Sequence, residues 1–304
     1  MPDSVAYQPD LMARIFTSKR MFSYERVFGK LTDRELVGIY VWNQALGGEL
    51  YPLLSAAEIT LRNAIDVAFI SFAGKWWWKR IQYKSYASTP GHKPPFEIRA
   101  LKDNFASAAS YVRKEKFRRY HRQNHHPSHE ETVASTEFST WEFAMSDELL
   151  GPSLFWNTMI TQVFKGAWPS QSAATTLLTA RDLVKTIREY RNRVAHNEPL
   201  WKAYRVKTPQ DAIAYIGTKI DAAEQLIALL SPEKHDLLTK HKLFSNARRM
   251  NSLPEISRFQ NSRETLWLGS FGDVKAALSH AQSCNGIFSC KLGPTGGCFL
   301  IVPQ

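Results

Sequence analysis

An arginine and a histidine stand at R-x4-H spacing near the expected end of a helix. They are Arg191 and His196, with Asn192 between them. Asn192 precedes His196 by four residues, so a helix places amide and imidazole on one face, with Arg191 about 100° round it. To cut RNA without a metal, a site must activate the 2'-OH, stabilise charge on the phosphate oxygens and assist the leaving 5' oxygen. Histidine, arginine and asparagine can supply these functions.

Helix ends also carry these residue types for structural reasons. Arginine, asparagine and histidine side chains interact with the last carbonyl groups of a helix and with the negative end of its dipole. The spacing alone favours this structural interpretation. Only the surrounding sequence favours a catalytic site instead.

Three segments of the chain resemble one known family. Glu58–Ile65 is similar to an early family helix with the pattern E-x-x-L-R-N-A. A family connector that has the motif S-F-G-F-W and, further on, L-W is similar to Pro152–Trp156 with the later Phe164 and Trp168. Arg191–Pro199 matches R-N-R-I-A-H-H-E-P almost letter for letter. Because their order and separation also agree, the chain resembles the Abi-like family of HEPN-domain proteins, which are bacterial abortive-infection and toxin-type ribonucleases.

This resemblance, which covers roughly residues 25 to 230, implies a fold and an activity. The implied fold is mainly α, an HEPN-type helical bundle. Two copies of the bundle are implied to form a homodimer, which brings their R-x4-H motifs together. The implied activity is endonucleolytic cleavage of RNA with neither metal nor cofactor, leaving a 2',3'-cyclic phosphate. Arg191 and His196 are then the catalytic pair. His196 transfers a proton at the 2'-OH or the leaving oxygen, Arg191 binds the scissile phosphate, and Asn192 orients one of them.

Five further residues are candidates for lining this site. They are Glu58, Arg62, Asn63, Arg193 and Glu198. For Glu58 and Arg62 the alternative is a plain i,i+4 surface ion pair, which contributes only about 0.3 to 0.5 kcal/mol.

Two positions depart from the family's pattern. Asn197 stands where relatives often have a second histidine, which removes an extra acid or base. Glu198 stands where the HEPN toxins that are silenced by adenylylation have a tyrosine, so that mode of control is not expected here.

The strongest competing interpretation is a protein without catalytic activity. An RNA-binding or adaptor protein of a phage-defence system would keep the bundle and use Arg191 and His196 only to hold RNA. A structural interaction module, whose motif is a helix cap, is a weaker alternative. The expected partners are RNA, a second copy of the chain, and an antitoxin that is either RNA or protein.

The charge of the chain favours a polyanionic partner. Lysine and arginine number 39 against 28 aspartate and glutamate, for a formal net charge of +11, and phosphate contacts made by such side chains release counterions. Many of the cations fall in one segment, with Tyr111, Phe117 and Tyr120 between them as stacking surfaces for unpaired bases. The candidate RNA-binding residues are Arg113, Lys114, Lys116, Arg118, Arg119 and Arg122. The alternative is an ordinary solvated helix face.

The sequence favours a cytoplasmic location. It lacks an apolar run of roughly 18 to 20 residues, and Met1-Pro2-Asp3-Ser4 does not begin a signal peptide. The presence of only three cysteines, all within Cys284–Cys298, argues against a secreted disulfide framework.

Residues 1–240 are the expected helical domain. The first 30 residues are expected to form an arm or short helices, and helical periodicity is strong after them. The pattern predicts a capping box at Thr32 with Glu35, and a helix that Gly47-Gly48 interrupts before a second helix continues. Trp76-Trp77-Trp78 is expected to form a packing or partner surface. Further helices are expected at residues 97–122, 153–165, 172–196 and 208–230, the third with Leu183, Ile187, Tyr190 and Val194 buried.

A small α+β appendage is expected over residues 253–304. The pattern predicts a strand at Glu264–Leu268, a helix at Val274–Ala281, and a hairpin from Gly286–Leu292 and Cys298–Val302. Gly293–Gly297 is interpreted as a hairpin turn, because no Lys-Ser/Thr follows it as in a phosphate loop.

Two groups of residues resemble metal ligands superficially. His280, Cys284, Cys290 and Cys298 could in principle bind zinc, but buried thiols in an apolar hairpin are the favoured interpretation. A second group has no cysteine to complete a tetrahedral set, and Pro127 breaks its helix, so a basic surface without metal is expected. Its members are His121, His125, His126 and His129.

Overall fold

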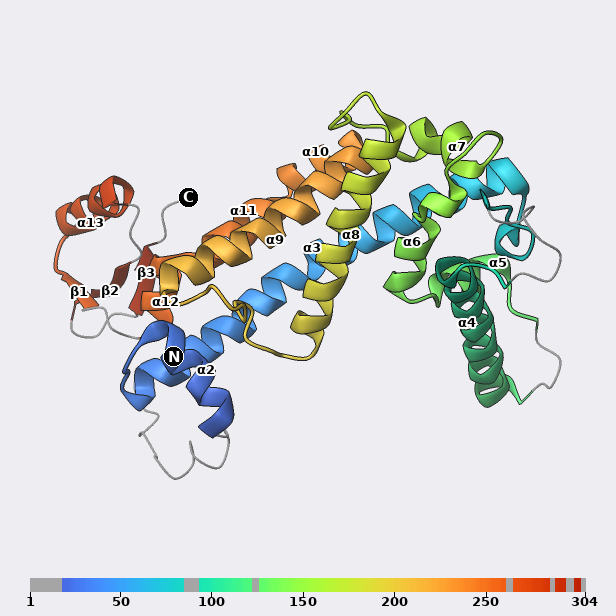
Figure 1. Cartoon of the computed structure of the whole chain (residues 1–304). Coiled ribbons are helices and arrows are strands. Elements are labelled where there is room, and N and C mark those ends of the chain that lie inside the picture. Colours follow the sequence, from blue (N-terminus) through green and yellow to red (C-terminus); the bar gives the residue numbers. More distant parts are fainter. Residues whose placement is uncertain are drawn as a thin grey trace. The chain divides into compact units, whose positions relative to one another are not determined.

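The chain is mainly helical, with a small α+β appendage at its C-terminal end, as expected (Figure 1). The computed structural model describes residues 18–84, 93–121, 126–260, 265–284, 288–293 and 298–301. Contacts divide the chain into two compact units. Unit 1 comprises residues 1–51, 193–220 and 245–304, and unit 2 comprises residues 52–192 and 221–244. No helix in the described part of the chain is both long and apolar enough to span a bilayer.

The longest helix, α3 (Asp33–Ala73), is one element of 41 residues, so the predicted break at Gly47-Gly48 is wrong. Each glycine costs about 1 kcal/mol relative to alanine inside a helix, and Pro52 removes one donor. However, fully buried side chains continue on both sides of the glycine pair, as at Leu46 and Leu50. Burial of this apolar stripe outweighs the local preference, because tertiary packing supplies most of the stability of protein helices.

The start of α3 is the predicted capping box. The backbone N–H of Thr32 donates to the Glu35 carboxylate at 2.8 Å, and the N–H of Glu35 donates to Thr32 Oγ1 at 3.4 Å. The backbone hydrogen bond from Thr32 lowers the pKa of Glu35, because it stabilises the charged form. The local sequence alone was sufficient to locate this end of the helix.

Unit 1 is built on an aromatic core. The rings of Trp42 and Trp201 stack with centroids 5.8 Å apart, and Tyr24 meets Trp201 edge-on at 4.9 Å. Trp42 also donates from Nε1 to the carbonyl oxygen of Met250 at 2.8 Å. These residues lie on α2 (Ser18–Phe28), on α3, after α8 (Ala173–Ala195) and on α11 (Leu243–Met250).

Other elements complete unit 1. α12 (Leu253–Phe259) approaches α3 closely at Gly38, where a Cβ atom would collide with the backbone of Phe259. α9 (Pro209–Leu230) begins in unit 1 and ends in unit 2. Asn251 donates to the carbonyl oxygen of Ile213 at 2.9 Å and ties α9 to the end of α11.

Besides parts of α3 and α9, unit 2 contains a further set of helices. They are η1 (Trp77–Lys79), α4 (Phe96–Tyr120), α5 (His129–Ala134), α6 (Phe138–Ala144), η3 (Asp147–Leu149), α7 (Phe155–Val163), most of α8 and α10 (Pro232–Lys240). Trp77 and Trp78 are buried, with Trp77 stacked on Phe69 and Trp78 on Phe105, each at 3.9 Å. The packing interpretation of these two tryptophans is therefore confirmed.

The helices predicted at residues 97–122, 153–165, 172–196 and 208–230 are confirmed as α4, α7, α8 and α9. On α8, Ile187 and Tyr190 are buried as predicted, while Leu183 and Val194 are half-buried. The prediction for His129 is wrong, because this side chain is 2% exposed and belongs to the core instead of a basic surface. His125 and Arg122 lie outside the described residues.

The appendage is a three-stranded sheet with one helix, as the C-terminal pattern predicted (Figure 1). β1 (Thr265–Leu268) pairs in parallel with β2 (Phe288–Leu292), which pairs antiparallel with β3 (Cys298–Ile301). α13 (Phe271–Cys284) connects β1 to β2 and contributes two alanines to the small core.

The thiol of Cys290 lies in this core. The side chain is fully buried, and burial raises the pKa of its thiol. No three potential ligands gather into a metal site within the described part of the chain. The glycine-rich segment that the sequence predicts as a turn lies, from residue 294 to 297, outside the described residues.

Candidate functional site

The end of α8 determines where the histidine of the R-x4-H motif lies. The N–H of Glu198 donates to the carbonyl oxygen of Arg193 at 3.1 Å, and the N–H of Asn197 donates to that of Val194 at 3.0 Å. These two bonds form a Schellman motif, in which the residue after the cap takes the left-handed conformation. Asn197 has φ 51°, and asparagine is one of the few residue types that adopt this conformation readily. His196 is therefore the capping residue of α8, and it is exposed.

The segment that follows the motif is held by Arg193. Its Nη1 donates to the carbonyl oxygens of Lys202 at 2.9 Å and Pro199 at 3.4 Å. The Glu198 carboxylate lies 3.8 Å from both Arg193 Nη1 and Lys202 Nζ. Arg193 and Glu198, both predicted to line the site, thus brace the backbone beside His196.

A buried asparagine from α3 completes this brace. Asn43 is 2% exposed. It accepts the N–H of Leu200 on Oδ1 at 3.0 Å and donates from Nδ2 to the carbonyl oxygen of Glu198 at 3.4 Å. Asn43 was not among the site residues that the sequence predicted. An amide on a buried stripe was the available signal, since buried polar groups are almost always hydrogen-bonded.

A groove of about 350 Å³ lies against this helix end. Gly47 and Gly48 of α3 form part of its wall, and a Cβ at Gly48 would have no atom within 4 Å. Tyr51 lies at the groove and is 52% exposed, and Gln44 lines it with a buried Nε2 that has no hydrogen-bond partner among the described residues. The remaining lining residues are Asn43, Val194, Ala195, Asn197, Glu198 and Leu200. His196 stands between two of them in the chain.

Within unit 2, Arg191 is paired with a carboxylate of α3. Arg191 Nε lies 3.6 Å from Glu58 Oε2. Burial raises the pKa of Glu58, and the charges of Arg191 and Arg62 partly offset that effect. Arg62 donates from Nη1 to the carbonyl oxygen of Ala134 at 3.4 Å, while its buried Nε has no partner among the described residues. The early helix segment and the R-x4-H arginine therefore meet in one charged cluster.

The remaining candidates project into solvent. Asn63, Asn192 and His196 are exposed, and their side chains form no hydrogen bond or ion pair with the described residues. Asn192 and His196 are four residues apart at the end of α8, where helical spacing places them on one face.

A model of the Abi-like protein family matches residues 7–202, which is more than half of the chain and includes every candidate residue described above. The chain belongs to the Abi-like family. Membership of this family indicates a role in abortive infection, a form of phage defence. No curated protein and no solved structure matches the chain.

The basic helix of this Abi-like protein is also within the matched region. Arg113, Lys114 and Arg119 of α4 are exposed. Two other cations of the helix have acidic partners: Lys116 Nζ lies 2.7 Å from Glu131, and Arg118 Nη1 lies 2.9 Å from Glu115.

Aromatic side chains share the surface of α4 with these cations. Tyr111, Phe117 and Tyr120 are 59%, 48% and 54% exposed, which leaves much of each ring open to solvent. Exposed aromatic rings beside cations also occur in proteins that bind single-stranded nucleic acid.

Proposed function

We propose that this Abi-like protein is a metal-independent endoribonuclease of an abortive-infection system, with Arg191 and His196 as its catalytic pair. The observation that carries the proposal is the pairing of Arg191 with Glu58 within unit 2. His196 follows Arg191 in the same family motif, at the end of α8, and is exposed. A helix cap alone would need neither a partly buried carboxylate for Arg191 nor an asparagine clamp on the backbone after His196.

Glu58 acts on Arg191 in this proposal. The carboxylate lies nearest to Nε of the guanidinium, and a guanidinium has five N–H donors in a planar fork. Donors that face away from Glu58 can bind two phosphate oxygens and stabilise the charge that develops on them. Glu58 is thus a positioning residue, and its partly buried charge keeps the arginine in one orientation.

His196 supplies proton transfer. Its imidazole is exposed to solvent, so an RNA strand can reach it, and histidine is the side chain that most often acts as a general acid or base in enzymes. Asn192 lies one helical turn earlier on the same face and orients the imidazole or the phosphate. One motif supplies a single histidine, whereas cleavage needs both a base and an acid. We therefore propose that two copies of the chain form a homodimer with a shared site.

The test is a cleavage assay with purified protein. RNA incubated with the wild type in excess EDTA is expected to be cut at an unchanged rate and to carry 2',3'-cyclic phosphate ends. Tight RNA binding without any cleavage would favour the alternative, a non-catalytic RNA-binding protein of the same defence system.

RNA affinity is expected to depend on the exposed cations of α4. The double variant Lys114→Ala/Arg119→Ala should reduce the slope of log affinity against log salt concentration by about 1.4, since each lost phosphate contact on a single strand contributes about 0.7. Titrations at several salt concentrations measure this slope.

A matched control is Arg205→Ala/Lys207→Ala, which removes two exposed cations elsewhere and lowers the net charge equally. It should leave the slope within error of the wild type. Equal slopes for all three proteins would place the RNA on another surface.

A further inference from the structure

Trp76 has a backbone conformation that large side chains rarely adopt. Its φ of 60° and ψ of 30° lie in the left-handed region, where a bulky residue is a genuine outlier. Such strain persists only where surrounding contacts impose it, and it occurs often at ligand-binding positions. Trp76 immediately precedes η1, and unlike its neighbours Trp77 and Trp78 it is not buried.

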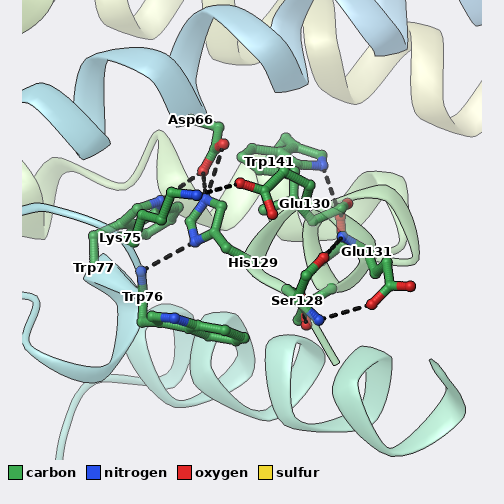
Figure 2. A network of polar contacts seen from close by, with 12 residues as sticks. Asp66, Lys75, Trp76, Trp77, Ser128, His129, Glu130, Glu131 and Trp141 are labelled. Atoms are coloured by element: carbon green, nitrogen blue, oxygen red, sulfur yellow. Dashed lines mark hydrogen bonds and ion pairs between the residues drawn. The ribbon is translucent and has the colours of Figure 1, made fainter. Parts of the chain in front are cut away.

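A buried polar network holds this conformation. The backbone N–H of Trp76 donates to His129 Nδ1 at 3.0 Å, so the proton of the ring is on Nε2, which lies 3.1 Å from both carboxylate oxygens of Asp66. Asp66 also accepts from Trp77 Nε1 at 2.8 Å. Figure 2 shows the His129 ring between the Asp66 carboxylate and the backbone nitrogen of Trp76. Both ring nitrogens of His129 therefore have hydrogen-bond partners. Together these hydrogen bonds fix the backbone of Trp76.

The indole of Trp76 lines a cavity of about 450 Å³ against α4. Ala106 and Ala109 line the cavity from the helix, with Lys102 one turn before Ala106 and Arg113 one turn after Ala109. The two alanines leave space for a ligand beside the helix. Lys102 and Arg113 lie on either side of this space. The volume is within the range of about 300 to 1,000 Å³ of small-ligand sites.

Lysine and arginine side chains give this cavity a positive charge. Lys79 places its Nζ 5.0 Å from the centroid of the Trp76 ring and also lines the cavity. No aspartate or glutamate is among the described residues that line it. An aromatic face with three surrounding cations is complementary to a flat ring that carries phosphate.

We propose that this cavity binds one nucleotide of a single-stranded RNA, with its base stacked on Trp76 and its phosphates held by Lys102 and Arg113. Lys79 is exposed, and lysine has a flexible four-carbon side chain, so its ammonium moves from the indole face to the phosphate when the base stacks. The cavity shares no residue with the Arg191–Glu58 pair, and the inference holds equally for a protein that binds RNA without cutting it.

Binding of a fluorescein-labelled, 2'-O-methylated oligoribonucleotide to the full-length protein tests the inference. This probe has no free 2'-OH and cannot be cleaved, so the result is independent of the proposed nuclease activity. Trp76→Gly removes the ring and suits the left-handed backbone, since glycine adopts positive φ without strain. We expect it to weaken binding about tenfold to a hundredfold, the scale of one lost base-stacking contact, while Trp76→Phe stays within about threefold of the wild type.

Two further variants make the result specific. Ala106→Leu fills the cavity from an exposed helix position and should weaken binding as Trp76→Gly does. Trp267→Ala is the matched control, because Trp267 is an exposed tryptophan whose ring also lies near a lysine, with Lys291 Nζ 4.8 Å from its centroid. This variant should bind as the wild type does. Wild-type affinity in both Trp76→Gly and Ala106→Leu would overturn the proposal.

Competition distinguishes a strand from a free nucleotide. Adenosine 5'-monophosphate should displace the probe from the wild type, but only at concentrations well above the affinity of the oligomer. Binding of the mononucleotide at least as tight as that of the oligomer would overturn the RNA assignment. Displacement by inorganic phosphate at the same concentrations would overturn the role of the base.

Discussion

Purified protein with His196→Ala is expected to cleave RNA about a hundredfold more slowly than the wild type, and Arg191→Ala to lose at least as much. The first variant removes the group that transfers the proton, and the second removes the charge that stabilises the phosphate oxygens; each such loss commonly costs two orders of magnitude or more. Initial rates on a defined RNA measure the effect. In cells, expression of the wild type should halt growth, and His196→Ala should restore it.

His241→Ala is the control for a histidine at a helix end. His241 caps α10 and is also exposed, so its loss should change neither cleavage nor thermal unfolding. Because His196 is exposed as well, the His196→Ala protein should unfold at the wild-type temperature. Cleavage at the wild-type rate by folded His196→Ala and Arg191→Ala proteins would end the assignment of the catalytic pair.

Mixed dimers would test whether the site is shared. If both copies contribute to each site, dimers of one wild-type and one His196→Ala chain should lose more than half of their activity. A protein that is monomeric at the assay concentration and fully active would contradict the homodimer.

The variant Asn43→Leu is expected to lower the free energy of unfolding by about 2 to 4 kcal/mol. Leucine has the same number and branching of side-chain heavy atoms but removes both hydrogen bonds to the segment after His196. A buried backbone group left without a partner costs about 1 to 3 kcal/mol, and the Glu198 carbonyl, which is only part-buried, is expected to contribute the smaller share. Urea unfolding monitored by circular dichroism measures the change. Cleavage should also fall at temperatures where the variant remains folded, because the segment beside His196 is then less constrained.

Asn63→Leu makes the same substitution at an exposed position of the same helix. It should change the free energy of unfolding by no more than about 0.5 kcal/mol. If Asn43→Leu is as stable as Asn63→Leu, the clamp does not support the helix end.

Partners that are distant in the chain explain what sequence reasoning missed. Asn43 and Leu200 are 157 residues apart, and only the folded structure shows that the amide of one binds the backbone of the other. His129 and Asp66 are 63 residues apart, so no local pattern distinguished a core histidine from a surface one. The continuity of α3 was missed for a related reason, since the cost of two glycines is local while the packing that outweighs it comes from other elements.

The sequence by itself determined the features that neighbouring residues control. The capping box at Thr32, the positions of α4, α7, α8 and α9, and the strand–helix–hairpin order of the appendage all follow from periodicity and from caps within a few residues. Membership of the Abi-like family was also readable from three short segments. The tertiary structure alone decided that Arg191 meets Glu58, that Arg193 braces the backbone, and that Trp76 is held in a strained conformation beside a cationic cavity. Hydrogen bonds and ion pairs act over a few ångströms in space, and residues far apart in the chain come within that range only when the helices pack.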